Sequence, residues 1–211
     1  MKTLYVLIGP PAIGKSTWIK RFAPHAEVIS RDDAIERIAH AHGLTYDDAY
    51  AFPPERSEDG QIISGMEKFG KVVPSDLDWR QHDFEVCRDI HRQAAKELKD
   101  MSMSCASGDN DVVLDMTNMD KKSRSLYMPL FTHHKKVAVV FNFKGDKLIA
   151  ALKKNAIKRS EELAKQGKNK TITGGIIDRM VAAYEAPETT EGFDDIVSYD
   201  SAREINWYSQ I

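Results

Sequence analysis

The chain has few of the residues that mark secreted, membrane-spanning or disulfide-rich proteins. Its 211 residues include only two cysteines, Cys87 and Cys105, whose spacing fits no metal-binding motif. No apolar run approaches the roughly 20 residues that a membrane-spanning helix needs, and no signal-like apolar block stands near the start. These absences exclude a disulfide framework and favour a cytoplasmic protein without a membrane partner.

The sequence also lacks an excess of charge of one sign. Its 30 Lys and Arg residues and 32 Asp and Glu residues give a formal net charge of −2 at pH 7. This balance excludes a generally basic, histone-like surface, so nucleic acid would have to bind at a local basic patch. Hydrophobic residues make up 42% of the chain, enough for one core, and we expect a single domain over residues 1–211.

Short apolar runs alternate with helix-like patterns along the chain. We expect strands at residues 4–8, 27–29, 112–115, 136–141 and 195–197. The alternation predicts an α/β fold, with a parallel five-stranded sheet and helices on both faces. Residues 45–105 exceed an ordinary crossover connection and predict a substrate-side insertion. Within it, residues 82–101 have the period of an amphipathic helix, whose predicted buried residues are Phe84, Cys87, Ile90, Ala94 and Leu98.

A phosphate-binding motif follows the first predicted strand. Residues 9–17, GPPAIGKST, fit the pattern G-x-x-x-x-G-K-[ST] and precede a helix-compatible segment. In this motif, backbone N–H groups and the N-terminus of the helix bind phosphates, so we expect the chain to bind ATP and Mg²⁺. We assign Lys15 to the β- and γ-phosphates and Ser16 to Mg²⁺. The predicted nucleotide-binding residues are Gly9, Ala12, Ile13, Gly14, Lys15, Ser16 and Thr17.

Acidic residues directly follow the second predicted strand. Asp32 lies in the sequence Ser30-Arg31-Asp32-Asp33, at the carboxyl end of a strand, where open α/β sheets bind their ligands. A carboxylate there can accept the proton of a hydroxyl that attacks a phosphoryl group, so Asp32 is the predicted general base. Arg31 is a predicted clamp for an anionic acceptor. The alternative is that one of these polar residues only caps the following helix.

A second acidic residue, Asp115, ends the third predicted strand. An acid there can hold a Mg²⁺-bound water beside Ser16, so we predict Asp115 as part of the metal site. Thr117, Asn118 and Arg124 follow in a loop and a short predicted helix, where they are candidates to contact the acceptor. For each of the loop residues, helix capping is the alternative.

A basic patch lies in the last third of the chain. It consists of Lys153, Lys154, Lys158, Arg159, Lys165, Lys168 and Lys170. Cations here can neutralise charge on a transferred phosphoryl group, and we predict Lys158 and Arg159 as catalytic. We expect residues 153–175 to form a helical lid, in which residues 166–170 are a loop that closes over the site. A solvated charged helix face is the alternative.

Together these motifs resemble those of a known enzyme group. The phosphate-binding motif, Arg-Asp-Asp after the second strand, D-x-T-N at residues 115–118 and the basic lid are similar to the kinase domain of T-even bacteriophage 5′-hydroxyl polynucleotide kinases. The similarity covers residues 1–40 and 110–200. It implies that Asp32 is the general base, that the loop lysine and serine are Lys15 and Ser16, and that the lid arginine corresponds to Lys158 or Arg159.

Two features depart from that family. Its polynucleotide kinases have an arginine three residues after the base, where this chain has Ile35, and the nearest arginine is Arg37. We therefore list Arg37 as a predicted acceptor-binding residue. The sequence has no D-x-D-x-T motif, so removal of 3′-phosphates is not expected.

The favoured interpretation is an ATP- and Mg²⁺-dependent kinase that phosphorylates a hydroxyl of DNA or RNA, at the 5′ end, in the host cytoplasm if the chain is phage-encoded. A kinase of 5-hydroxymethyluracil bases in DNA is an alternative, because Tyr46, Tyr50, Phe52 and Trp79 are candidates to stack on an extruded base. A small-molecule kinase and a non-catalytic nucleotide-binding switch also stay open, as does the oligomeric state.

Overall fold

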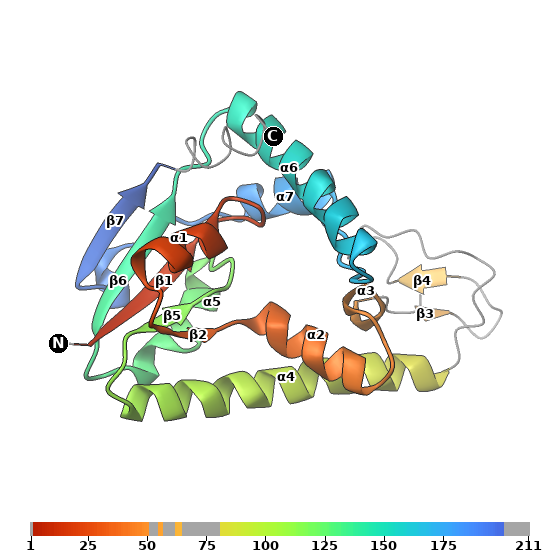
Figure 1. Cartoon of the computed structure of the whole chain (residues 1–211), viewed down its shortest axis with the longest axis horizontal. Helices are drawn as coiled ribbons and strands as arrows, with labels where there is room; N and C mark the ends of the chain where they lie inside the picture. Colours follow the sequence, from red (N-terminus) through yellow and green to blue (C-terminus); the bar gives the residue numbers. More distant parts are fainter. Residues whose placement is uncertain (1, 51–54, 57–61, 65–80, 201–211) are drawn as a thin grey trace.

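Strands and helices alternate along most of the chain (Figure 1). The structure is a computed structural model that describes residues 2–50, 55–56, 62–64 and 81–200, with the side chains of residues 55–56, 62–64 and 81–84 excepted. In chain order its elements are β1 (Thr3–Ile8), α1 (Lys15–Phe22), β2 (Glu27–Ile29), α2 (Arg31–Ala41), α3 (Tyr46–Ala49), β3 (Glu55–Arg56), β4 (Ile62–Ser64), α4 (Gln81–Ser107), β5 (Val112–Leu114), α5 (Lys121–Ser125), η1 (Met128–Leu130), β6 (Lys135–Phe141), α6 (Asp146–Lys165), α7 (Gly174–Ala182), η2 (Thr189–Glu191) and β7 (Asp195–Tyr199).

The main sheet has five strands in the order β2-β5-β1-β6-β7, and every neighbouring pair is parallel. This confirms the predicted fold class. The predicted bounds differ by one or two residues: β1 and β6 begin one residue earlier, β5 ends at Leu114 and β7 continues to Tyr199. In a parallel sheet the carboxyl ends of the strands share one edge, so the loops after β1, β2 and β5 meet there.

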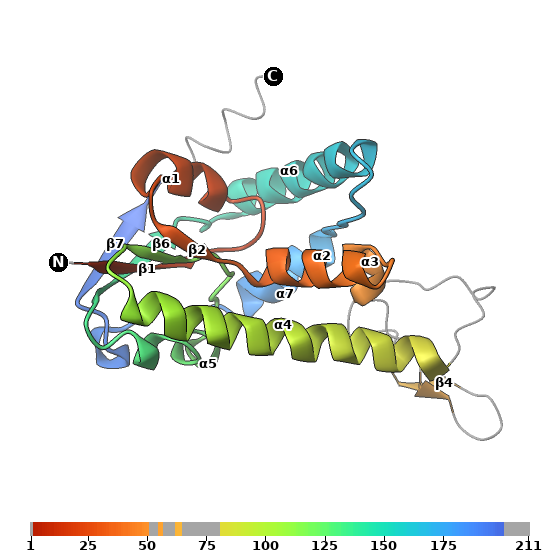
Figure 2. The same ribbon diagram turned by 60° about the horizontal axis from the view of Figure 1, so that its bottom comes forward.

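Helices cover both faces of this sheet. In Figure 2, α1 and α6 lie on one side of the strands, and α4 and α5 lie on the other. One buried cluster joins the first face of the sheet to α1, α6 and α7. A second cluster joins the opposite face to the C-terminal half of α4 and to η1. A parallel sheet needs this cover because both of its faces are apolar.

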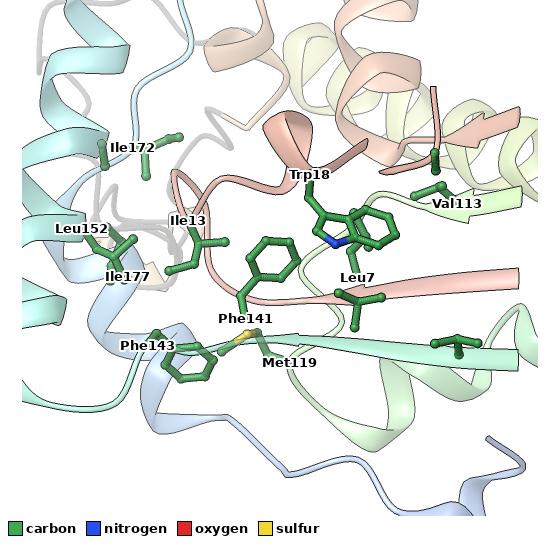
Figure 3. Packing of buried hydrophobic residues seen from close by; sticks show 14 residues of the cluster. Leu7, Ile13, Trp18, Val113, Met119, Phe141, Phe143, Leu152, Ile172 and Ile177 are labelled. Carbon is green, nitrogen blue, oxygen red and sulfur yellow. The ribbon is translucent and has the colours of Figure 1, made fainter. Parts of the chain in front are cut away.

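The phosphate-binding loop is part of the first cluster. Ile13 is fully buried and packs in the same cluster as Phe141, Leu152 and Ile177 (Figure 3). The loop also lies so close to β6 that a Cβ atom on Gly9 would stand 3.1 Å from the side chains of both Ile13 and Phe141. The core therefore fixes the loop, and any larger residue at this position would have to displace the Ile13 or Phe141 side chain.

Helix α4 fills much of the long interval between β2 and β5. The predicted helix over residues 82–101 is confirmed and is longer at its C-terminus. Cys87, Ile90, Ala94 and Leu98 are buried as expected, whereas the side chain of Phe84 lies outside the described residues. Ile90 and Ala94 pack with the buried face of α2 and with α3. Helix α4 therefore supports α2, whose first turn contains Asp32.

A buried ion pair connects α5 to η2. The guanidinium of Arg124 bonds both carboxylate oxygens of Glu191, with Nε and Nη2 each at 2.7 Å, and both side chains are at most 5% exposed. Its Nη1 donates to the carbonyl oxygens of Asn118 and Glu185 at 3.1 and 2.9 Å. The prediction that Arg124 binds the acceptor is wrong, because its charged group is enclosed by protein.

We expect Arg124→Leu to lower the free energy of unfolding by about 3–5 kcal/mol, because it leaves the Glu191 carboxylate buried without its partner. Urea unfolding at pH 7, followed by tryptophan fluorescence, measures the change. The matched control is Lys153→Ala, which removes the exposed ion pair with Asp178 and should cost less than about 1 kcal/mol. Equal losses in the two variants would contradict a structural role for Arg124.

Candidate active site

The phosphate-binding loop leads directly into α1. Gly14 has a φ of 100° and Ala12 a φ of 61°, the left-handed conformations that turn the loop. Helix α1 begins at Lys15; no side chain caps its N-terminus, and its first turn contains no acidic residue. An anion would therefore meet the positive end of the helix without competition from a carboxylate of that turn.

The side chain of Lys15 folds back onto the start of this loop. Its Nζ donates to the carbonyl oxygens of Gly9 and Pro10 at 2.9 and 3.0 Å. Desolvation lowers the pKa of Lys15 to about 8, although the carboxylates of Asp115 and Asp32 oppose the shift and favour its charged form. The ammonium thus lies within electrostatic reach of both predicted acids.

Asp115 follows β5 at the same edge of the sheet. Its backbone N–H donates to the carbonyl oxygen of Ile29 at 2.9 Å, which ties the end of β5 to the end of β2. Desolvation raises the pKa of its carboxyl, and the charge of Asp32 adds to this effect, while Lys15 and Arg159 oppose it. The structure therefore brings together Lys15, Asp32, Asp115 and Arg159, which come from four separate segments.

The side chain of Ser30, and not that of Asp32, caps α2. Ser30 Oγ accepts a hydrogen bond from the backbone N–H of Asp33 at 3.3 Å. Asp32 instead has a half-exposed carboxylate, to which the Tyr46 hydroxyl donates at 2.9 Å and Lys170 Nζ at 2.8 Å. Desolvation raises the pKa of Asp32, but the contacts with Lys170, Tyr46 and Lys15 outweigh it and lower the pKa below its ordinary value.

The buried side chain of Asn118 connects β1 to β5. It is 2% exposed, and its Nδ2 donates to the carbonyl oxygens of Leu7 and Leu114 at 2.9 and 3.4 Å. The prediction that its side chain contacts the acceptor is wrong, because the amide is enclosed between β1 and β5. The carbonyl oxygen of Thr117 accepts from the Gly9 N–H at 3.0 Å, and the half-buried side chain of Thr117 stays a predicted acceptor contact.

The two predicted cations of α6 differ in position. Arg159 lies within electrostatic reach of Lys15 and Asp115. It is exposed, but it is three residues after the buried Ala156 and seven after the buried Leu152, so it lies next to the buried side of the helix. Lys158 is also exposed, and it lies about 100° from Arg159 around the helix. The geometry therefore distinguishes two residues that the sequence alone leaves equivalent.

The loop after α6 docks on α2 and α3. Thr171 donates to Asp47 through its backbone N–H at 3.0 Å and through its hydroxyl at 2.6 Å. Lys168 pairs with Glu36 at 2.9 Å, and Lys170 reaches Asp32. These contacts place the basic loop over the helix that carries the predicted base.

The two predicted arginines of α2 point to different places. Arg31 is exposed beside Asp32, and its charge is close enough to Tyr50, His91 and Tyr127 to influence their ionisation. Arg37 instead forms an ion pair with Glu97 of α4. Acceptor binding by Arg31 and Arg37 stays a prediction, and only Arg31 adjoins Asp32.

Two site residues were missed by the sequence reasoning in their observed roles. The sequence indicates Tyr46 only as a base-stacking candidate, together with Tyr50, and Lys170 only as one charge of the basic patch and part of the loop expected to close over the site. The other stacking candidates, Phe52 and Trp79, lie outside the described residues. A partial clue was the sequence T-x-x-D at residues 45–48, which predicts a helix start that would fix the orientation of Tyr46.

Ser16 and Asp115 offer a hydroxyl and a carboxylate, the oxygen donors that Mg²⁺ prefers. Ser16 is exposed in the first turn of α1, and Asp115 lies within electrostatic reach of Lys15. The described residues contain no group of three or more His, Cys, Asp or Glu side chains able to hold a metal ion. Two protein donors fit a Mg²⁺ ion that is bound mainly by nucleotide phosphates and water.

None of the helices in the described part of the chain is long and apolar enough to cross a membrane.

The strand order, the phosphate-binding loop and the lid-like α6 define a P-loop kinase fold. The chain belongs to the AAA domain family, whose model matches residues 4–187. No curated protein sequence matches the chain significantly.

Solved structures share the fold at low sequence identity. A candidate kinase from Chloroflexus aurantiacus is 14% identical with a TM-score of 0.51, over 99% of this chain and 94% of that one. A chain of the PezAT chromosomal toxin–antitoxin system of Streptococcus pneumoniae is 15% identical with a TM-score of 0.56, over 96% and 69%. A gluconokinase from Sinorhizobium meliloti 1021 is 12% identical with a TM-score of 0.48, over 99% and 97%. At these identities the first two structures support the fold alone.

Proposed function

We propose that the protein is a kinase that transfers the γ-phosphate of ATP to a hydroxyl of a nucleic acid, at the 5′ end of DNA or RNA. The observation that carries the proposal is the convergence of Lys15 in the phosphate-binding loop with Asp32, Asp115 and Arg159. A switch protein needs a nucleotide site, but it does not need a second carboxylate beside the phosphate-binding lysine. A phosphoryl transfer enzyme uses one to accept a proton.

The charge around the site supports a polyanionic acceptor. Although the whole chain has a net charge of −2, exposed cations gather on α6 and at the start of α2. They are Arg31, Lys154, Lys158, Arg159 and Lys165. Such cations attract phosphates and make binding salt-dependent, as expected for a nucleic-acid acceptor. We propose residues 153–175 as the lid and residues 45–105 as the acceptor-side insertion.

In the proposed reaction, the acceptor hydroxyl oxygen forms a bond to the γ-phosphorus of ATP, and its proton passes to Asp32. The bond between the γ-phosphorus and the β–γ bridging oxygen breaks, and its electron pair leaves with ADP. Lys15 would hold the β- and γ-phosphates, and Arg159 would stabilise charge on the transferred group. We expect Ser16 and Asp115 to hold Mg²⁺, which neutralises phosphate charge when bound.

The first test is transfer of labelled γ-phosphate from ATP with Mg²⁺ to 5′-hydroxyl oligonucleotides, with and without internal 5-hydroxymethyluracil. We expect label at 5′ ends, removed by a phosphatase that acts on terminal phosphates, and weaker acceptor binding as salt rises. Label confined to modified bases would reassign the acceptor to the base. Label on neither substrate would overturn the nucleic-acid proposal.

Asp32→Asn tests the general base. The amide is the same size but cannot take the proton, so we expect turnover to fall by about 10²–10⁴-fold while ATP affinity is kept. Steady-state transfer and calorimetric titration with ATP measure the two effects. Wild-type turnover in this variant would exclude Asp32 as the base.

A matched pair of substitutions tests the lid cation. We expect Arg159→Ala to lower kcat by about 10²–10³-fold, because a cation aimed at the transferred phosphoryl group is lost. Lys158→Ala removes a neighbouring exposed charge and should leave kcat near the wild-type value. The reverse order of effects would assign the role to Lys158.

A further inference from the structure

We propose that Tyr46 is a positioning residue, which fixes the carboxylate of Asp32 through a hydrogen bond to Oδ1. The inference rests on the proposed function, because it assumes that Asp32 is the base. It adds a residue of α3, outside the recognised motifs, to the machinery of the site.

The contacts of Asp32 divide its two oxygens between two elements. Tyr46 donates to Oδ1 at 2.9 Å, and Lys170 donates to Oδ2 at 2.8 Å. Lys170 also lies over the Tyr46 ring, with Nζ 4.3 Å from the ring centroid. Because Lys170 belongs to the loop after α6, its contact can open with the lid, whereas the contact with Tyr46 is made within the α2–α3 unit.

The position of Tyr46 is itself well supported. Thr45 caps α3 in a reciprocal capping box with Asp48. The Tyr46 ring packs against Tyr50 at 4.9 Å between centroids, and Tyr50 packs edge-on against His91 of α4 at 4.8 Å. His91 Nε2 lies 2.9 Å from the carbonyl oxygen of Ala49. This row of rings connects Tyr46 to the long helix, so its hydroxyl is held in place before any substrate binds.

Tyr46 is protonated at neutral pH and is therefore a donor, and its surroundings reinforce this state. Desolvation raises the pKa of Tyr46, and the negative charge of Asp32 raises it further. Aspartate has two rotatable side-chain bonds, so without this donor the carboxylate could turn toward Lys170 or Lys15. A base must lie within hydrogen-bond reach of the proton it accepts, and fixing one oxygen directs the other.

The groups that face Asp32 are Tyr46 and Tyr50 from α3 and its end, Lys170 from the loop after α6, Lys15 from α1 and Asp115 from the end of β5. Tyr46→Phe removes only the hydroxyl of the first group and leaves the ring stack intact. Tyr5→Phe is the matched control. Tyr5 lies in β1, its ring packs on Trp18 of α1, and the substitution likewise removes one hydroxyl.

The experiment compares both variants with the wild-type protein in the oligonucleotide transfer assay. We expect Tyr46→Phe to lower kcat about tenfold with unchanged KM for ATP, measured well below the melting temperature of the variant, which loss of the hydrogen bond to a charged group also lowers. Tyr5→Phe should keep wild-type kcat. A wild-type kcat in Tyr46→Phe, or a loss that only follows melting temperature, would overturn the proposal.

A second measurement does not depend on catalysis. In protein labelled with carboxyl-¹³C aspartate, the Asp32 resonance is assigned by its disappearance in Asp32→Asn. We expect Tyr46→Phe to move its titration to higher pH, because a donor that stabilises the carboxylate is lost. An unmoved titration would overturn the contact. If the wild-type protein labels no oligonucleotide, the proposed function fails, and this titration still decides whether Tyr46 holds Asp32.

Discussion

Two hydrogen bonds beyond the end of the β1–β5 ladder determine the geometry of the whole site. The ladder itself ends at the pair Val6 and Leu114. Past it, the Gly9 N–H donates to the Thr117 carbonyl, and the buried amide of Asn118 donates to the Leu7 carbonyl. They hold the phosphate-binding loop against the loop that follows Asp115. The proximity of Lys15, the predicted phosphate-binding lysine, to Asp115, the predicted metal-binding acid, is thus an extension of sheet pairing, and burial of the Asn118 amide makes this pairing costly to break.

Local patterns explain why so much of the fold could be predicted. Short apolar runs and the phosphate-binding motif are contiguous, and a parallel sheet brings strand ends together whatever the loop sequences are. The same reasoning could have separated Arg159 from Lys158. Counting back from Arg159 by three and seven residues reaches Ala156 and Leu152, the buried positions of α6, which the helical period makes recognisable.

The remaining errors come from partners that are distant in sequence. Arg124 in a short polar helix looks like a ligand-binding residue, and only Glu191, 67 positions later, shows that it is buried. The contact between Lys170 and Asp32 spans 138 positions. Such pairs depend on how the loop after α6 and η2 fold back on the sheet, which no periodicity or motif encodes. Charged and amide side chains are therefore assigned to ligands too readily when their partners are unknown.

The burial of Ile13 makes the phosphate-binding loop part of the main hydrophobic core, whereas most loops lie at the surface. The Ile13 side chain is enclosed with Phe141 and Leu152, and Gly9, where a Cβ atom would crowd Ile13 and Phe141, lies four residues before it. The loop consequently cannot open locally without exposing apolar surface that belongs to the main core. The same packing therefore supports both the shape of the phosphate-binding loop and the stability of the fold. Substitutions in the core of β6 or α6 would change nucleotide affinity and the free energy of unfolding together.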